Sequence, residues 1–122
     1  MREATSRDYA EWLATMEWTH MATIRTNYKM KPQQVNKFCN SLFKTNRGLE
    51  TIFYTIERDK DLMANHAHLM LMQKDVTLSN TQVNKLPFSV PYYEKIRSTT
   101  AVSNYTTKYI KQGIDYDILF RE

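Results

Sequence analysis

The sequence predicts a single α+β domain: a mainly antiparallel β-sheet with helices packed on one face. Short runs rich in β-branched and aromatic residues alternate irregularly with segments whose apolar residues recur at helical spacing. The two clearest strand-like runs are separated by a mostly polar stretch at residues 58–65, which favours a hairpin. A hairpin pairs its strands antiparallel, and irregularly placed helices are typical of α+β folds.

The first half of the chain predicts a helix, a strand and a second helix. Thr5 or Ser6 can cap the first helix, which continues through Trp12 and Leu13. Residues 18–26 alternate like a strand. Pro32 suits the first turn of the second helix, which we expect to end near Gly48. The apolar face of that helix consists of Val35, Phe38, Leu42 and Phe43.

The second half predicts the hairpin, two further helices and two further strands. Residues 51–57 are hydrophobic on both faces, so we expect a central strand, which pairs with a strand at 66–72. Ser79 can cap a short helix that stops before Pro87. Residues 88–96 are extended, with Pro91 indicating an edge position or a bulge. The remaining elements are a helix from Ser98 or Thr99 to Gly113 and a strand over 114–120.

Composition limits the classes of protein that fit. The chain has 122 residues, enough for one core, so we treat residues 1–122 as one domain. No apolar run is long enough for a membrane-spanning helix, and the N-terminus does not resemble a secretory signal. Cys39 is the single cysteine, which favours a reduced, cytoplasmic setting. The net charge of +4 and the many tyrosines suit nucleic acid.

Two histidines one residue apart are the first candidate for chemistry. If residues 66–72 form a strand, His66 and His68 share one face, and Ala67, Leu69 and Leu71 point into a core. One register of the hairpin brings Glu57 to the same face as both imidazoles. Two nitrogens and a carboxylate with open positions suit Mn²⁺ or Mg²⁺ bound to a phosphate.

A helical Tyr-x-x-Lys segment is the second candidate. Tyr105, Lys108 and Tyr109 share a helix face at spacings of three and four residues. A lysine ammonium beside a phenol favours the phenolate, which is a nucleophile, and it can also neutralise a phosphate. An alternative is that both tyrosines are core aromatics at helical spacing.

Taken in order, these elements resemble the HUH endonucleases, and more narrowly the nicking domain of rolling-circle replication initiator (Rep) proteins. Residues 22–26 resemble the first motif of that family, and His66-Ala67-His68 matches the second, His-hydrophobic-His. Glu57 takes the place of the acidic third ligand, and Tyr105 to Lys108 matches the third motif. The resemblance covers residues 20–112. The sequence has no segment corresponding to the helicase domain of eukaryotic viral Reps, so a stand-alone phage, archaeal-virus or plasmid nickase and an excised domain both fit.

The resemblance implies a ferredoxin-like or RRM-like HUH fold and a metal-assisted reaction. Glu57, His66 and His68 would hold a divalent metal, Mn²⁺ or Mg²⁺, and Tyr105 would attack the scissile phosphodiester of single-stranded DNA, with help from Lys108. The products are a 5′-phosphotyrosine and a free 3′-OH that starts rolling-circle replication. Tyr109 is a possible second nucleophile, because some initiators use two tyrosines four residues apart. A replication origin, a host helicase and polymerase, and the host cytoplasm follow as expectations, with the protein a monomer or homodimer.

Other residues carry simpler expectations. Arg25, Tyr28, Lys29 and Lys31 lie where the first strand meets its helix and are candidates for DNA contact. We expect core positions for the two tryptophans and structural roles for two further side chains: Trp12, Trp18, His20 and Cys39. Two other functions stay open: a single-tyrosine HUH transposase, and a non-catalytic ferredoxin-like module that binds nucleic acid.

Overall fold

The chain forms one antiparallel sheet with helical segments packed on it, which confirms the predicted α+β class. The computed structural model describes residues 11–26, 28–57, 65–73, 89–96, 108 and 115–121. Within them the sheet has five strands in the order β4-β1-β3-β2-β5, all neighbours antiparallel. The elements are β1 (His20–Arg25), α2 (Pro32–Thr45), β2 (Leu49–Glu57), β3 (His66–Gln73), β4 (Ser89–Lys95) and β5 (Asp115–Phe120).

Strand positions agree with the hydrophobic patterns. β2 lies between β3 and β5 and is buried almost throughout, as its two hydrophobic faces predict. β4 lies at an edge of the sheet, and its register against β1 shifts between Thr23 and Arg25, opposite the segment that contains Pro91. Edge positions and bulges are among the settings in which a strand proline is tolerated.

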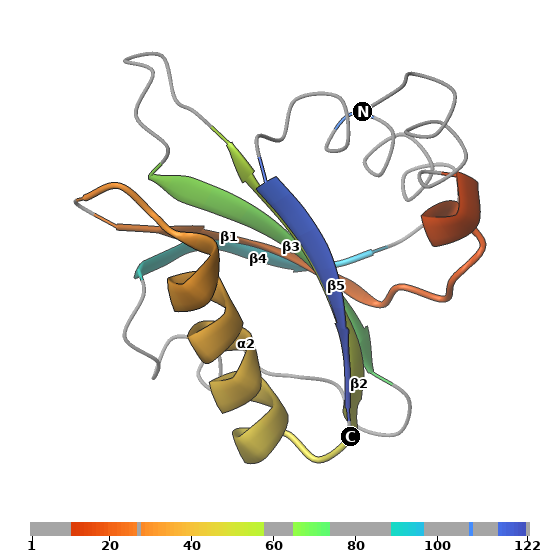
Figure 1. Ribbon diagram of the computed structural model, residues 1–122. Helices are drawn as coiled ribbons and strands as arrows, with labels where there is room; N and C mark the ends of the chain where they lie inside the picture. Colours follow the sequence, from red (N-terminus) through yellow and green to blue (C-terminus); the bar gives the residue numbers. More distant parts are fainter. Residues whose placement is uncertain are drawn as a thin grey trace.

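Helix α2 covers one face of the sheet (Figure 1). Pro32 occupies its first turn, and the side chain of Gln34 accepts a hydrogen bond from the backbone N–H of Lys31 at 2.8 Å. The helix ends at Thr45, earlier than the predicted end near Gly48. Asn46 is extended there, and its side-chain amide donates to the carbonyl of Leu42 at 3.0 Å, which caps the helix before the glycine is reached.

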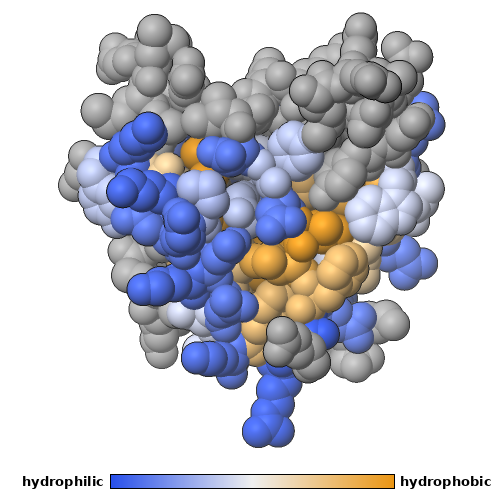
Figure 2. All heavy atoms as spheres, viewed as in Figure 1, coloured by the Kyte–Doolittle hydropathy of each residue, from blue (hydrophilic) through white to orange (hydrophobic). Residues whose placement is uncertain are grey.

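The main core fills the space between α2 and the sheet. Strand alternation sends Ala67, Leu69 and Leu71 of β3 into this core, where all three are fully buried, as predicted. Beside α2, hydrophobic side chains gather on the surface over β5, next to the hydrophilic outer side of the helix (Figure 2). Phe120 of β5 is 53% exposed and lines a groove with Phe43 of α2.

A second, smaller core lies on the opposite face, so the expectation of helices on one face only is wrong. Residues 11–14 are helical, and Leu13 packs there with Trp18 and with Phe53 of β2. Trp18 is buried as predicted, but Trp12 is 47% exposed. Adjacent residues on a helix point about 100° apart, and here Leu13 packs in the small core while Trp12 lies at the surface.

Several predicted elements lie outside the described residues. These are the capping residues Thr5 and Ser6, the loop at 58–64, the helix from Ser79, and most of the helix between Ser98 and Gly113. Among the helices that the structure describes, none is long and apolar enough to span a membrane.

Candidate metal centre

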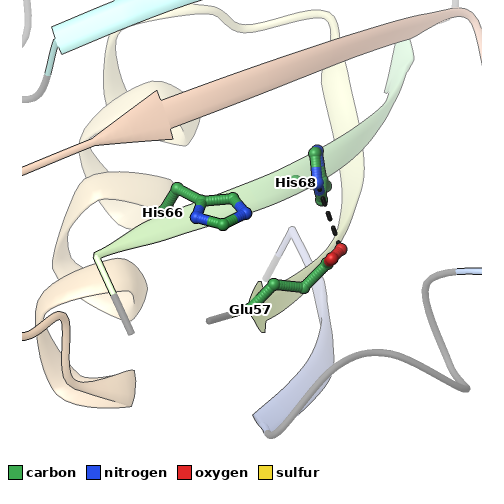
Figure 3. Close-up of side chains that lie close together, drawn as sticks. All are labelled: Glu57, His66 and His68. Carbon is green, nitrogen blue, oxygen red and sulfur yellow. Dashed lines mark ion pairs between the residues drawn. The ribbon is translucent and has the colours of Figure 1, made fainter. Parts of the chain in front are cut away.

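The register of the central hairpin brings the three predicted ligands together. Glu57, the last residue of β2, pairs directly with His66, the first residue of β3. Directly paired residues project from the same face of a sheet, and His68 lies two residues further along β3. All three side chains therefore share the face opposite α2, at one end of the sheet (Figure 3).

The three side chains are close enough to hold one ion. One ligand atom from each lies within 4.8 Å of the others. The Nε2 atom of His68 is 3.1 Å from Oε2 of Glu57, and the two imidazole rings are 5.4 Å apart and nearly perpendicular.

The site is more enclosed than an open sheet face would be. Glu57 and His66 are buried, with 7% and 8% of their surface exposed, whereas the side chain of His68 keeps 22%. A buried carboxylate is costly unless cations or hydrogen-bond donors compensate it. The exposure of His68 leaves the cluster accessible to solvent from one side.

Neighbouring residues orient both imidazoles. The Oγ1 atom of Thr23, directly opposite His68 on β1, lies 3.2 Å from Nδ1 of that histidine. The Nδ1 atom of His66 lies 3.5 Å from the side-chain oxygen of Asn65. When one ring nitrogen is held in this way, the other is oriented toward an ion, as in many histidine metal sites.

Positive charge stabilises the carboxylate. Burial alone would raise the pKa of Glu57, but the contact with His68 and the charges of His68, His66 and Lys108 outweigh it, so that pKa is lowered. Glu57 is therefore ionised near neutral pH, the form in which a carboxylate binds a metal. The site is anionic on one side and rimmed by basic groups.

The donor set fits a divalent cation. Two imidazole nitrogens and one carboxylate oxygen at a single corner occupy only part of a coordination shell, so positions remain for water or a substrate oxygen. Histidine and carboxylate ligands are compatible with several metals. The arrangement therefore establishes a group that could bind a metal ion without selecting which.

Among the other predicted residues, Arg25 adjoins this corner. Arg25 pairs directly with His66 across β1 and β3, and its side chain is exposed on the face of the cluster. The loop after β1 is joined to Asn65, the residue before β3, by a 3.0 Å hydrogen bond from Thr26 N–H to the carbonyl of Asn65. Its candidate DNA-contacting side chains are all exposed: Tyr28, Lys29 and Lys31.

The Tyr-x-x-Lys segment is described at one position only. Lys108 is helical and exposed, and its charge acts on the carboxylate of Glu57. This places the lysine of the segment on the side of the molecule that carries the cluster. Tyr105 and Tyr109 lie outside the described residues.

Two neighbours of the cluster were not identified from the sequence. Thr23 and Asn65 received no role, although alternation along β1 puts Thr23 on the same face as Arg25. No local sequence pattern shows that β1 is the neighbour of β3 in the sheet. Thr23 thereby comes to lie beside His68.

The expected structural roles of His20 and Cys39 are confirmed. The ring of His20 is buried, its Nδ1 lies 2.8 Å from Oγ1 of Thr19, and it stacks on Tyr93 with ring centres 5.3 Å apart. Cys39 is fully buried in α2, and burial raises the pKa of its thiol. Neither belongs to the cluster.

Comparison with known proteins identifies no family for this chain. No protein-family model matches it, and neither curated proteins nor solved structures give a match.

Proposed function

We propose that the protein is a metal-dependent nickase and strand transferase for single-stranded DNA, of the rolling-circle replication initiator type in the HUH superfamily. One observation carries the proposal: Glu57, His66 and His68 converge on the sheet face in the register that the motif pattern requires. A two-histidine, one-carboxylate cluster beside exposed cations is suited to holding a phosphate. The lysine of the Tyr-x-x-Lys segment acts on the same cluster.

The cluster would take Mn²⁺ or Mg²⁺. Both ions bind carboxylate and phosphate oxygens readily and keep coordination positions for water. When bound, such an ion offsets the charge that develops on a phosphodiester under attack. Thr23 and Asn65 keep the imidazoles of His68 and His66 in place for this purpose.

Tyr105 would supply the nucleophile. Its phenolic oxygen attacks the phosphorus in line, the bond to the 3′ oxygen breaks, and the strand is left as a 5′-phosphotyrosine and a free 3′-OH. Lys108 would favour the phenolate and contribute positive charge near the phosphate. Tyr109 is the candidate for a second cleavage. The phosphotyrosine bond can be attacked later by a 3′-OH, which rejoins DNA and restores the tyrosine.

The exposed residues at the end of β1 would receive the DNA strand. Arg25, Lys29 and Lys31 offer cations for phosphates, and Tyr28, 52% exposed, offers a ring for a base. Origin DNA, a host helicase and a host polymerase are the partners that rolling-circle replication requires. The host cytoplasm is the compartment that this role implies.

A covalent-adduct assay tests the proposal. The protein is incubated with a fluorescent pool of single-stranded DNA and Mn²⁺, and adducts that survive denaturing electrophoresis are counted. We expect an adduct with wild type, none with EDTA, and loss with Tyr105→Phe and Glu57→Gln. Lys44→Ala, an exposed change on α2, is the matched control and keeps the adduct.

Each contrary outcome of this assay has a clear meaning. If no pool yields an adduct with wild type, the nickase proposal is wrong. If Tyr109→Phe abolishes the adduct and Tyr105→Phe does not, the nucleophile is Tyr109. Mapping the joined DNA separates a nicked circular origin from the hairpin ends that a transposase would use.

A further inference from the structure

An exposed tyrosine and an exposed arginine flank the cluster of Glu57, His66 and His68 on the side of β4. Tyr92 of β4 pairs directly with Thr23 of β1, which in turn pairs with His68 of β3. Arg25 pairs with Ser89 on one side and with His66 on the other. Direct partners share a face, so Tyr92 and Arg25 both project from the face of the cluster.

Both side chains are exposed and can contact a ligand. Tyr92 is 40% exposed, and Arg25 is also exposed. The residue next to Tyr92 shows the opposite behaviour: Tyr93 lies on the other face, half-buried, and packs against the main core and His20. The two tyrosines therefore differ in role, and the exposed one is not needed to fill either core.

The ring of Tyr92 is held in place. Its hydroxyl donates a hydrogen bond to the carboxylate of Glu94, two residues along the same strand and on the same face. An aromatic ring that is already oriented loses little freedom when a flat ligand stacks on it. Glu94 pairs with Met21, one step further from Arg25, so negative charge lies on one side of the ring and positive charge on the other.

We propose that Tyr92 and Arg25 form a nucleotide subsite next to the cluster of Glu57, His66 and His68. In this subsite Tyr92 stacks on a base of single-stranded nucleic acid, and Arg25 pairs with a phosphate of the same strand. Bases of any identity have an aromatic face, and guanidinium binds phosphate through paired N–H donors. Tyr92 lies two strand spacings from β3, roughly 10 Å. Glu94 repels phosphates, so the backbone passes over Arg25 toward His66 and away from the Glu94 side.

This subsite rests on the proposed function for its place in a reaction, but its binding can be measured separately. The probe is a fluorescent 20-residue oligothymidylate in EDTA, where no metal-assisted cleavage takes place, and affinity is followed by anisotropy. We expect Tyr92→Leu to weaken binding roughly ten-fold and Tyr92→Phe to keep most of it, because the phenylalanine ring still stacks. Arg25→Ala should weaken binding and lower the salt dependence by about one phosphate contact.

Two matched variants separate the subsite from general effects. Phe120→Leu removes an even more exposed aromatic ring from the far end of β5, and Lys44→Ala removes an exposed cation from α2. Neither change should alter affinity more than two-fold. Circular dichroism checks that each variant is folded. If Tyr92→Leu binds as wild type does, or no more weakly than Phe120→Leu, the subsite is excluded.

The failure of the subsite and the failure of the nickase proposal give different results. If wild type forms the covalent adduct but Tyr92→Leu and Arg25→Ala do not change the affinity for oligothymidylate, only the subsite is contradicted. If wild type binds oligothymidylate through Tyr92 and Arg25 but never forms an adduct, the subsite is supported and the nickase proposal is contradicted. No binding of oligothymidylate by wild type contradicts the subsite directly.

Discussion

The hydroxyl of Thr23 lies 3.2 Å from Nδ1 of His68, so a residue of β1 orients an imidazole of β3. The other nitrogen of the same ring, Nε2, faces Glu57 at 3.1 Å. His68 is thus held from both sides in a chain of three residues on three adjacent strands. Breaking the first link should disturb the ligand without removing it.

We expect Thr23→Val to weaken Mn²⁺ binding by about 10- to 100-fold, the usual effect of losing an outer-shell partner. Thr23→Ser keeps the hydroxyl and should bind nearly as wild type does. Isothermal titration calorimetry measures both. Thr51→Val removes a buried hydroxyl from the same face of β2, further from the cluster, and is the matched control. Equal losses with Thr23→Val and Thr51→Val would show that Thr23 has no orienting role.

Arg121 should stabilise the fold by fastening the end of α2 to the sheet. Its guanidinium donates hydrogen bonds to the carbonyls of Leu49 and Phe43, each at 2.7 Å, and to that of Asn46. The cation also lies near the C-terminal end of the helix dipole. Arg121→Ala should lower the free energy of unfolding by about 2 kcal/mol, measured by urea denaturation.

Lysine cannot reproduce the forked geometry of Arg121, so Arg121→Lys should recover less than half of that stability. Lys44→Ala, nearby on α2 but exposed, should change the unfolding free energy by no more than about 0.5 kcal/mol. An Arg121→Ala variant as stable as wild type would contradict the fastening role.

Acid should destabilise the protein partly through His20. Burial, with a smaller effect from the charge of Lys95, lowers the pKa of His20 below its ordinary value of 6.5. Below that pH the unfolded chain takes up a proton that the folded protein resists, so stability falls as pH falls through and below 6.5. Urea denaturation at pH 7.5 and 5.5 in EDTA should show a smaller loss for His20→Gln than for wild type. An identical loss in both would assign the pH dependence to other groups.

Cys39 should be inert in the native protein. The thiol is fully buried in the main core, and its pKa is raised by burial and by the charge of Asp117. The thiolate is the reactive form, so a thiol reagent such as DTNB should label Cys39 only after unfolding in urea. Fast labelling of the folded chain would contradict the position of this residue in the core.

The sequence predicts the elements that depend on local pattern and misses what depends on strand neighbours. Helix α2, the alternation of β3 and the burial of Cys39 follow from spacing and residue type. The position of Glu57 beside the histidines could be predicted, because few pairings of the two hairpin strands place their hydrophobic residues on the same face. The pairing of β1 with β3 has no local signal, so the contact of Thr23 with His68 and the place of Tyr92 beside the cluster were not predicted.

The two tryptophans show a second limit of prediction from the sequence. Trp12 and Leu13 both fitted an apolar helix face, but only Leu13 packs in the small core opposite α2. The structure buries Leu13 and exposes Trp12. Helical spacing identified the segment but not the angle at which it meets the sheet.

The most direct test of the account is whether Glu57, His66 and His68 bind one divalent ion through both imidazoles. Titration with Mn²⁺, followed by electron paramagnetic resonance, gives the stoichiometry, and electron spin echo modulation detects ¹⁴N coupling from bound imidazole. We predict one ion per chain with nitrogen coupling, which is lost in the variant His66→Ala/His68→Ala and persists in His20→Gln. No bound Mn²⁺, or nitrogen coupling unchanged in the double variant, would contradict the metal centre and with it the proposed mechanism.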